Sequence, residues 1–249
     1  AFWLALDAIN FGSGWFPTLR KRGDLSGYNT IAAGLRDHVE AAGPWSADEL
    51  TGLDGARLAP ILGQDPGHEL MGLYAAALAD LGARVRDVHG GSFAAVVDAA
   101  GGSAVHLATA LGGWACFADC DRYDELRIPF LKRAQIAAAD LDRAGVARWS
   151  DLGRLTMFAD NLVPHVLRLD GVLEFAPGLV ARIEREDLIE HGSPEEVEIR
   201  ACAVHAVELI VAAGRPGLTA SAVDQHLWQR GQGTRYKAVP RHRSRCTAY

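Results

Sequence analysis

The chain has 249 residues, of which 49% are hydrophobic and 22% are charged, and its formal net charge is −6. This length allows one sizeable hydrophobic core, and the acidic balance argues against a protein that grips a nucleic-acid duplex. No apolar run reaches the roughly 18–20 residues that span a bilayer, which argues against a membrane protein.

Neither a targeting signal nor a metal-binding pattern stands out in the sequence. No cationic segment precedes an apolar one near the N-terminus, so we expect a cytoplasmic protein, although a start at Ala1 leaves a preceding segment open. Of the four cysteines, only Cys116 and Cys120 lie close together, and their C-x3-C spacing suits one helical turn better than a zinc knuckle. We therefore expect reduced cysteines and no metal site.

Helical periodicity dominates the sequence, and runs of alternating β-branched residues are scarce. The clearest helix begins at Pro194, where Ser193 as the N-cap and Glu196 at the third helical position form a capping box. Helices are expected over residues 70–81, 130–141, 160–169 (interrupted by Pro164), 176–186, 194–211 and 219–228, with a further short element starting at Ser150 as its N-cap. The predicted fold class is mainly α.

We expect a compact single domain over residues 1–249. No repeat period is evident, and no long low-complexity linker divides the chain. Residues 12–65 are expected to form the most irregular part of this domain.

No familiar local motif for catalysis occurs, whether a glycine-rich nucleotide loop, a His-Glu-x-x-His metal motif or a nucleophile elbow. What remains is a set of polar residues inside apolar segments, and Asp160 is the most informative of them. It follows the apolar stretch Leu155–Ala159, so its carboxylate is expected to be partly desolvated and open to tuned reactivity. The alternative is a helix N-cap, which the local pattern favours.

One helix face near the C-terminus combines an aromatic ring with polar groups. Asp224, Gln225, Trp228 and Gln229 lie at i, i+1, i+4 and i+5. A flat aromatic side chain beside donors and acceptors suits the recognition of a nucleobase edge. The same pattern fits a boundary helix with a half-buried tryptophan, and the pattern does not decide between the two.

Two further clusters place polar groups on apolar helices. Asp7 and Asn10, at i and i+3, are expected to share one helix face. Lys132 and Arg133, with the amide of Gln135, form either an anion site or a set of side chains that extend to solvent from the rim of the core.

The C-terminal residues 230–249 carry six lysine or arginine side chains and no acid. On this pattern alone a solvated tail is the favoured interpretation. The alternative is a segment that folds back over a small anionic ligand.

Five sequence blocks occur in an order that resembles one known family. They are Asp7–Phe11, Phe130–Ile136, Leu155–Asp160, Glu198–Glu208 and His242–Tyr249. Together they resemble the queuosine salvage protein family, the queuosine 5'-phosphate N-glycosylase/hydrolases. The similarity runs from the first expected helix to the last residue and is weak between about residues 12 and 65.

The resemblance implies an all-α fold similar to that of helix-hairpin-helix DNA glycosylases. It implies the release of queuine from queuosine 5'-monophosphate without a metal or an organic cofactor, with Asp160 as the catalytic carboxylate. Substrate contacts are expected from Asn10, Phe11, Lys132, Phe158, Asp224, Gln225, Trp228 and Gln229. In this interpretation Lys132 and a tail arginine hold the 5'-phosphate, and Phe11, Phe158 or Trp228 stacks on the base.

The implied leaving group explains why a carboxylate is needed. Queuine is a 7-deazaguanine, with carbon where guanine has N7, so protonation at N7 cannot assist its departure. The enzyme must rely instead on stabilising or capturing the ribosyl cation, which a fixed carboxylate below C1′ can do.

Two other functions remain open on the sequence. One is a DNA-base glycosylase, by fold analogy, although the acidic body and the lack of a basic hairpin argue against it. The other is a non-catalytic deazaguanine nucleotide-binding protein. Asn161, Leu162 and His165 depart from the family pattern, so the base pocket is expected to differ in detail.

Overall fold

The computed structural model describes residues 1–249 as thirteen α-helices, three short 3-10 helices and one antiparallel pair of strands. The predicted mainly α class is therefore confirmed. The elements, in chain order, are α1 (Phe2–Ala8), η1 (Phe16–Thr18), α2 (Gly27–Ala42), α3 (Ala47–Thr51), α4 (Gly55–Ile61), α5 (Glu69–His89), α6 (Phe93–Asp98), α7 (Ala104–Gly112), η2 (Ala115–Phe117), β1 (Cys120–Tyr123), β2 (Leu126–Pro129), α8 (Lys132–Arg143), η3 (Leu152–Arg154), α9 (Leu162–Leu169), α10 (Pro177–Glu184), α11 (Pro194–Ala213), α12 (Ala220–Gly231) and α13 (Thr234–Lys237). No helix combines the length and the hydropathy needed to cross a bilayer.

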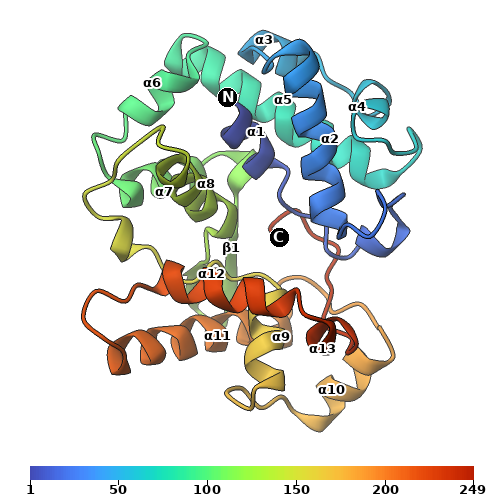
Figure 1. Cartoon of the computed structure of the whole chain (residues 1–249), viewed down its shortest axis with the longest axis vertical. Helices are drawn as coiled ribbons and strands as arrows, with labels where there is room; N and C mark the ends of the chain where they lie inside the picture. Colours follow the sequence, from blue (N-terminus) through green and yellow to red (C-terminus); the bar gives the residue numbers. More distant parts are fainter.

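The buried side chains form two main hydrophobic clusters. The first contains 40 residues, drawn mostly from α1 to α8, and the second contains 15 residues, drawn mostly from α9, α11 and α12. In Figure 1 the first group of helices fills the upper half of the molecule and the second group the lower half, and the end of the chain lies between them. Residues 155–160 run along the boundary, because Phe158 packs in the first cluster while Met157 and Ala159 pack in the second.

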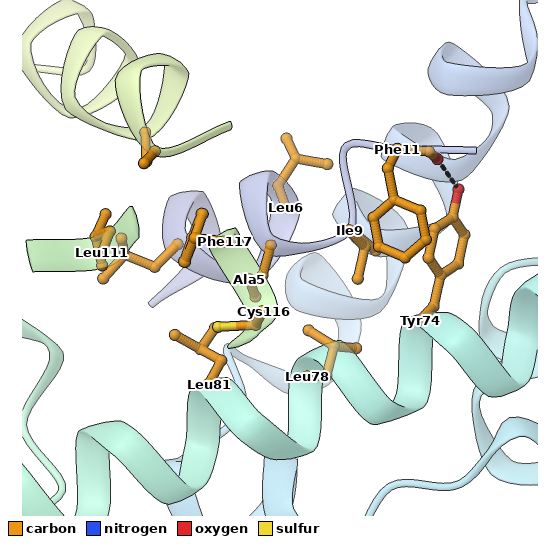
Figure 2. Close-up of a cluster of buried hydrophobic side chains, with 14 of the residues drawn as sticks. Ala5, Leu6, Ile9, Phe11, Tyr74, Leu78, Leu81, Leu111, Cys116 and Phe117 are labelled. Atoms are coloured by element: carbon orange, nitrogen blue, oxygen red, sulfur yellow. Dashed lines mark hydrogen bonds between the residues drawn. The ribbon is translucent and has the colours of Figure 1, made fainter. Parts of the chain in front are cut away.

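Helix α5 is the longest helix and supports the first cluster. Its fully buried residues recur every three or four positions, as the spacing of 70–81 predicts. Figure 2 shows the side chains of α1 over this face, with Phe11 beside Tyr74 at one end. The Tyr74 hydroxyl donates a hydrogen bond of 2.8 Å to the carbonyl oxygen of Phe11. This bond holds the turn that follows α1.

We expect Tyr74→Phe to lower the free energy of unfolding by about 1–3 kcal/mol, because the buried carbonyl of Phe11 loses its partner. Chemical denaturation of the purified protein measures the change. Tyr123→Phe is the matched control, since the Tyr123 hydroxyl bonds to Glu198 at the surface. A control variant as unstable as Tyr74→Phe would contradict the prediction.

The expectation that residues 12–65 are the most irregular part is wrong. Helices α2, α3 and α4 occupy much of this range. Each begins at a side-chain cap: Ser26 accepts the N–H of Asn29, Ser46 forms a full capping box with Glu49, and Asp54 caps α4. Helices α3 and α4 are short and pack against α5, so they depend on their caps and on this packing more than on a long apolar period.

Several expected helix boundaries also move. The helix expected over 160–169 begins at Leu162, so Pro164 falls in its first turn, where its missing N–H breaks no helical hydrogen bond and the helix is not interrupted. Ser150 does not cap a helix; its hydroxyl bonds to the carbonyl of Gly102, and η3 starts after Asp151. Cys120 lies in β1 rather than in a helical turn, and all four cysteines are unpaired.

Candidate active site

A cavity of about 730 Å³ opens between the two hydrophobic clusters. Its walls come from the turn after α1, the loop before α2, helices α8 and α12, residues 158–162 and the C-terminal segment. Eight of the nine residues singled out from the sequence line it: Asn10, Phe11, Lys132, Phe158, Asp160, Asp224, Gln225 and Trp228. The fold thus brings together segments that lie up to 218 positions apart, from Asn10 to Trp228.

The two carboxylate oxygens of Asp160 lie in different environments. Its Oδ1 accepts the N–H groups of Leu162 and Val163, at 2.8 and 3.0 Å, at the start of α9. Its Oδ2 has no hydrogen-bond partner within the chain, and the residue lines the cavity. One oxygen therefore fixes the carboxylate, and the other remains available to a ligand.

The segment that carries Asp160 has no regular secondary structure, and side chains from three helices hold its backbone. Gln135 of α8 accepts the N–H of Thr156 at 2.8 Å, and Asp224 of α12 accepts that of Phe158 at 3.1 Å. The Nε–H of Arg200, from α11, donates to the carbonyl of Ala159 at 3.0 Å. The position of Asp160 is therefore set by tertiary contacts rather than by its own element.

Lys132, at the first position of α8, is only 5% exposed and does not extend into solvent. Its ammonium group donates to the backbone oxygen of Asn10 at 2.9 Å and to the side-chain oxygen of Asn10 at 3.2 Å. Burial lowers the pKa of Lys132 to about 8, while the charge of Asp160 opposes this shift. A buried lysine beside a carboxylate is a suitable ligand for an anionic substrate group. Arg133, by contrast, is used inside the core, where it donates to backbone carbonyls of Ala8 and Cys116.

Asp224 provides a second carboxyl group in a different environment. It is 4% exposed, and burial raises its pKa well above the usual range, with the charge of Asp160 acting in the same direction. One of its oxygens already accepts the N–H of Phe158. Asp224 is therefore favoured as a neutral acid that can donate a hydrogen bond.

The other residues of α12 divide between the cavity and solvent. Gln225 lines the cavity and accepts a hydrogen bond from Arg143 at 3.2 Å, and Trp228 lines the cavity while half-buried. Gln229 is exposed and lies outside the cavity, whereas Gln232 lines it. At about 100° per residue, Gln229 is rotated about 140° from Asp224, so the four residues do not form one narrow face.

The N-terminal pair Asp7 and Asn10 does not share a helix face, because α1 ends at Ala8 and Asn10 lies in the turn beyond it. Asp7 is fully buried, neither of its carboxylate oxygens has a hydrogen-bond partner, and burial raises its pKa well above the usual range. Phe11 borders the cavity, but its ring lies in the core, 4.9 Å from the Tyr74 ring, as Figure 2 shows. Phe158 and Trp228 are therefore better placed to stack on a base.

The basic C-terminal segment is not a solvated tail. The carbonyl of Tyr249 accepts the N–H of Gly12, and the carbonyl of Arg243 accepts the N–H of Ile189. Alternate side chains from His242 onward are buried, which fixes the segment against the rest of the fold. It adds Lys237, Arg241 and Arg243 to the cavity wall.

The arginines of this segment differ in how they are neutralised. Arg243 pairs with Glu186 at 3.5 Å, and Arg245 pairs with Glu69 at 3.8 Å. Arg241 forms no ion pair, its Nε is buried without a partner, and it lies near the charge of Asp160. Arg241 is thus the tail arginine that is free to bind an anion in the cavity.

A family model described as queuosine salvage protein matches residues 1–249. The chain belongs to the queuosine salvage protein family. The resemblance seen in the five sequence blocks is therefore confirmed.

Three relatives carry the name queuosine 5'-phosphate N-glycosylase/hydrolase. The protein from Sphaerobacter thermophilus is 35% identical over 258 residues, which cover 99% of this chain and 80% of the relative. The protein from Nematostella vectensis is 29% identical over 280 residues, 98% of this chain and 80% of the relative. The mouse protein is 33% identical over 177 residues, and this match spans about half of its length, 52%.

Two of the three positions expected to depart from the family pattern, Asn161 and His165, bind the C-terminal segment. The side-chain amide of Asn161 donates to the carbonyl of His242 at 3.0 Å. His165 is buried outside the cavity, and burial lowers its pKa to about 4, so its neutral ring donates from Nε2 to the carbonyl of Tyr236 at 2.9 Å. In this queuosine salvage family member, these side chains help to hold Arg241 at the cavity.

A cluster of potential metal ligands lies outside the cavity lining, and no local sequence pattern predicts it. Ligand atoms of Asp121, His191 and Glu196 lie within 4.8 Å of one another. The Arg200 guanidinium lies 3.1 Å from Asp121 and 3.6 Å from Glu196, and contacts with Cys246 and Glu196 raise the pKa of His191 to about 10. Two cations already neutralise these carboxylates, so the cluster is an ion-pair network.

Proposed function

We propose that this protein hydrolyses the N-glycosidic bond of queuosine 5'-phosphate and releases queuine. The relatives' names support the substrate, and the cavity supports the chemistry. One observation carries the proposal: the Asp160 carboxylate is fixed through one oxygen, while the other is left without a partner at a cavity that also holds Lys132 and Asp224. A cavity of about 730 Å³ is of the size that small-molecule sites occupy.

Asp160 acts on the sugar in this proposal. The bond between C1′ and the base nitrogen breaks with its electron pair leaving on the base, so positive charge develops on the ribose. The free oxygen of Asp160 stabilises this charge or captures C1′ covalently. Water then attacks C1′ to supply the new hydroxyl group, which releases Asp160 if it was bound, and the proton that water loses replaces the one taken up by the base nitrogen. Prior fixation of the carboxylate means that it does not need to reorganise during the reaction.

Asp224 and the lining aromatic residues act on the base. A neutral Asp224 can donate a hydrogen bond or a proton to the departing deazaguanine, which cannot be protonated at position 7. The split between an ionised and a neutral carboxyl group is typical of acid and base roles in one site. Phe158 or Trp228 stacks on the ring, and Gln225 bonds to its edge.

Lys132 and Arg241 hold the 5'-phosphate in this proposal. Both lie near Asp160, and Arg241 has no carboxylate of its own to satisfy. Charge-assisted hydrogen bonds from two cations suit a phosphate dianion.

Arg241→Ala is expected to raise the KM for queuosine 5'-phosphate about tenfold or more and to change kcat little. It removes a phosphate contact equally from the ground state and the transition state. The KM for the nucleoside queuosine is expected to stay within about twofold. Arg245→Ala is the matched control, because Arg245 lies on the same segment but outside the cavity. An equal effect of Arg241→Ala on both substrates would contradict the phosphate role.

The overall proposal is tested by incubating the protein with queuosine 5'-phosphate, queuosine and a duplex with a damaged base, then measuring the released base. We expect rapid release of queuine from the nucleotide. Release from the duplex alone would indicate a DNA-base glycosylase. Binding of the nucleotide without release would indicate a carrier protein.

A further inference from the structure

Arg200 is a buried charged residue near the site that forms hydrogen bonds with several neighbours. Its side chain, in the second turn of α11, is completely buried. Its Nη2 lies 2.8 and 2.7 Å from the two carboxylate oxygens of Asp119. Its guanidinium carbon lies 3.9 Å from the centre of the Phe130 ring and 4.7 Å from that of Tyr249. The group is thus fixed in position and orientation.

The contacts of Arg200 lead to both sides of the cavity. Its Nε donates to the carbonyl of Ala159, the residue that precedes Asp160, at 3.0 Å. Its partner Asp119 accepts the backbone N–H of Lys132 at 2.8 Å. A single chain of hydrogen bonds therefore joins the segment of the carboxylate to the first residue of the lysine helix.

Neither end of this chain of bonds is fixed by its own secondary structure. Leu131, before Lys132, has a φ of +52°, a left-handed conformation that is uncommon for a residue other than glycine. Such a conformation persists only where surrounding contacts hold it, and here Asp119 accepts the N–H groups of both Leu131 and Lys132. The segment before Asp160 is likewise irregular.

We propose that Arg200, acting through Asp119 and the carbonyl of Ala159, is a positioning residue that sets the separation of Lys132 and Asp160. This inference rests on the proposed function of those two residues. Arginine suits the task because its planar fork donates in several fixed directions at once, which a lysine cannot do. An error of about 1 Å in the placement of catalytic groups lowers rates by about 100-fold.

The ion-pair network supplies matched variants. Asp119 and Asp121 both bind Arg200, but only Asp119 also holds Lys132. Asp119→Asn is expected to lower kcat for queuosine 5'-phosphate at least tenfold with KM within about threefold. Asp121→Asn is expected to keep kcat within about twofold, and thermal melting shows how far each variant is destabilised. Arg200→Lys is expected to behave like Asp119→Asn.

A second readout does not depend on turnover. The charged and titratable groups that act on Lys132 are Asp7, Asp119, Asp140, Asp160, Asp224 and Arg133. Asp119→Asn removes a negative charge that favours the lysine cation, so the pKa of Lys132 is expected to fall below its wild-type value of about 8. Nitrogen-15 NMR of the lysine side chains in the ligand-free protein measures this pKa, and Asp121→Asn is expected to leave it unchanged.

The two readouts separate the possible failures. A wild-type protein that releases no queuine would overturn the proposed function, while the NMR titration would still report whether Asp119 holds Lys132. Release by the wild type, with equal kcat and equal Lys132 pKa in Asp119→Asn and Asp121→Asn, would overturn the positioning role alone. A loss confined to Asp119→Asn and Arg200→Lys, without a matching loss of stability, would support it.

Discussion

Asp160→Asn is expected to lower the rate of queuine release by about 10³-fold or more, which corresponds to about 4 kcal/mol of activation free energy. The asparagine oxygen can still accept the N–H groups of Leu162 and Val163, so the start of α9 is preserved. What disappears is the negative charge beside C1′, the group proposed to stabilise or capture the ribosyl cation. Single-turnover release of queuine measures the loss, and calorimetric titration is expected to show near-normal substrate binding.

Two control variants separate the effect of the Asp160 charge from the effect of its hydrogen bonds to the start of α9. Asp54→Asn makes the same change at the N-cap of α4, where the carboxylate also accepts a backbone N–H but does not line the cavity, and is expected to keep full activity. Asp160→Ala removes the acceptor as well as the charge, so it is expected to lose about 1 kcal/mol of stability in addition to activity. Release by Asp160→Asn at more than a tenth of the wild-type rate would remove Asp160 from the catalytic role.

The helices that the sequence predicts best are those with strong local signals. The capping-box pattern at Ser193 and the apolar period of 70–81 both mark real helices, α11 and α5. Only half of the predicted box forms, because the Glu196 side chain accepts the N–H of Gly192 rather than that of Ser193. Helices α3 and α4 are difficult to predict from the sequence because they have only five and seven residues, although the Ser46–Glu49 capping-box spacing is visible in it. Helix α2 has 16 residues and an apolar period of its own, so the local pattern does indicate it. The stability of α3 and α4 depends on packing against α5, which lies later in the chain, and local patterns do not contain that contact.

For the site, too, local sequence patterns predict only part of what the contacts between distant segments produce. The local sequence favoured a cap at Asp160 and the family resemblance favoured catalysis, and the geometry is compatible with both because the two carboxylate oxygens have separate environments. No local pattern places Lys132, Asp160 and Asp224 around one cavity. The resemblance alone connected them, since they lie on three elements.

The residues that the sequence did not reveal act through distant contacts. In the sequence, Arg200 looks like an ordinary helical arginine. Its role is visible only in the folded chain, where α11 packs against the segment that ends at Asp160. The tail pattern favoured solvation, and only the folded chain shows that Arg241 reaches the cavity without a carboxylate partner. Charge composition states how much charge a segment has, but not which charges remain unpaired after folding.

Lys132→Ala is expected to lower kcat/KM for queuosine 5'-phosphate about 100-fold and that for queuosine less than tenfold. Removal of one partner from a buried, charge-assisted contact typically costs about 2–5 kcal/mol, and only the nucleotide has the phosphate that Lys132 is proposed to bind. Steady-state kinetics with both substrates measures the difference. Lys132→Gln is a useful companion, because its amide can still donate to Asn10 after the charge is lost.

The same lysine gives the wild-type enzyme a distinctive pH dependence. The cation is present below its pKa of about 8 and is lost as the pH rises through that value, so kcat/KM is expected to fall above about pH 8. A bound phosphate dianion favours the cation, so the decline in kcat is expected at a higher pH than the decline in kcat/KM. An ordinary exposed lysine would place both declines near pH 10. Equal losses for nucleotide and nucleoside in Lys132→Ala, with an unchanged alkaline decline, would show that Lys132 does not bind the phosphate.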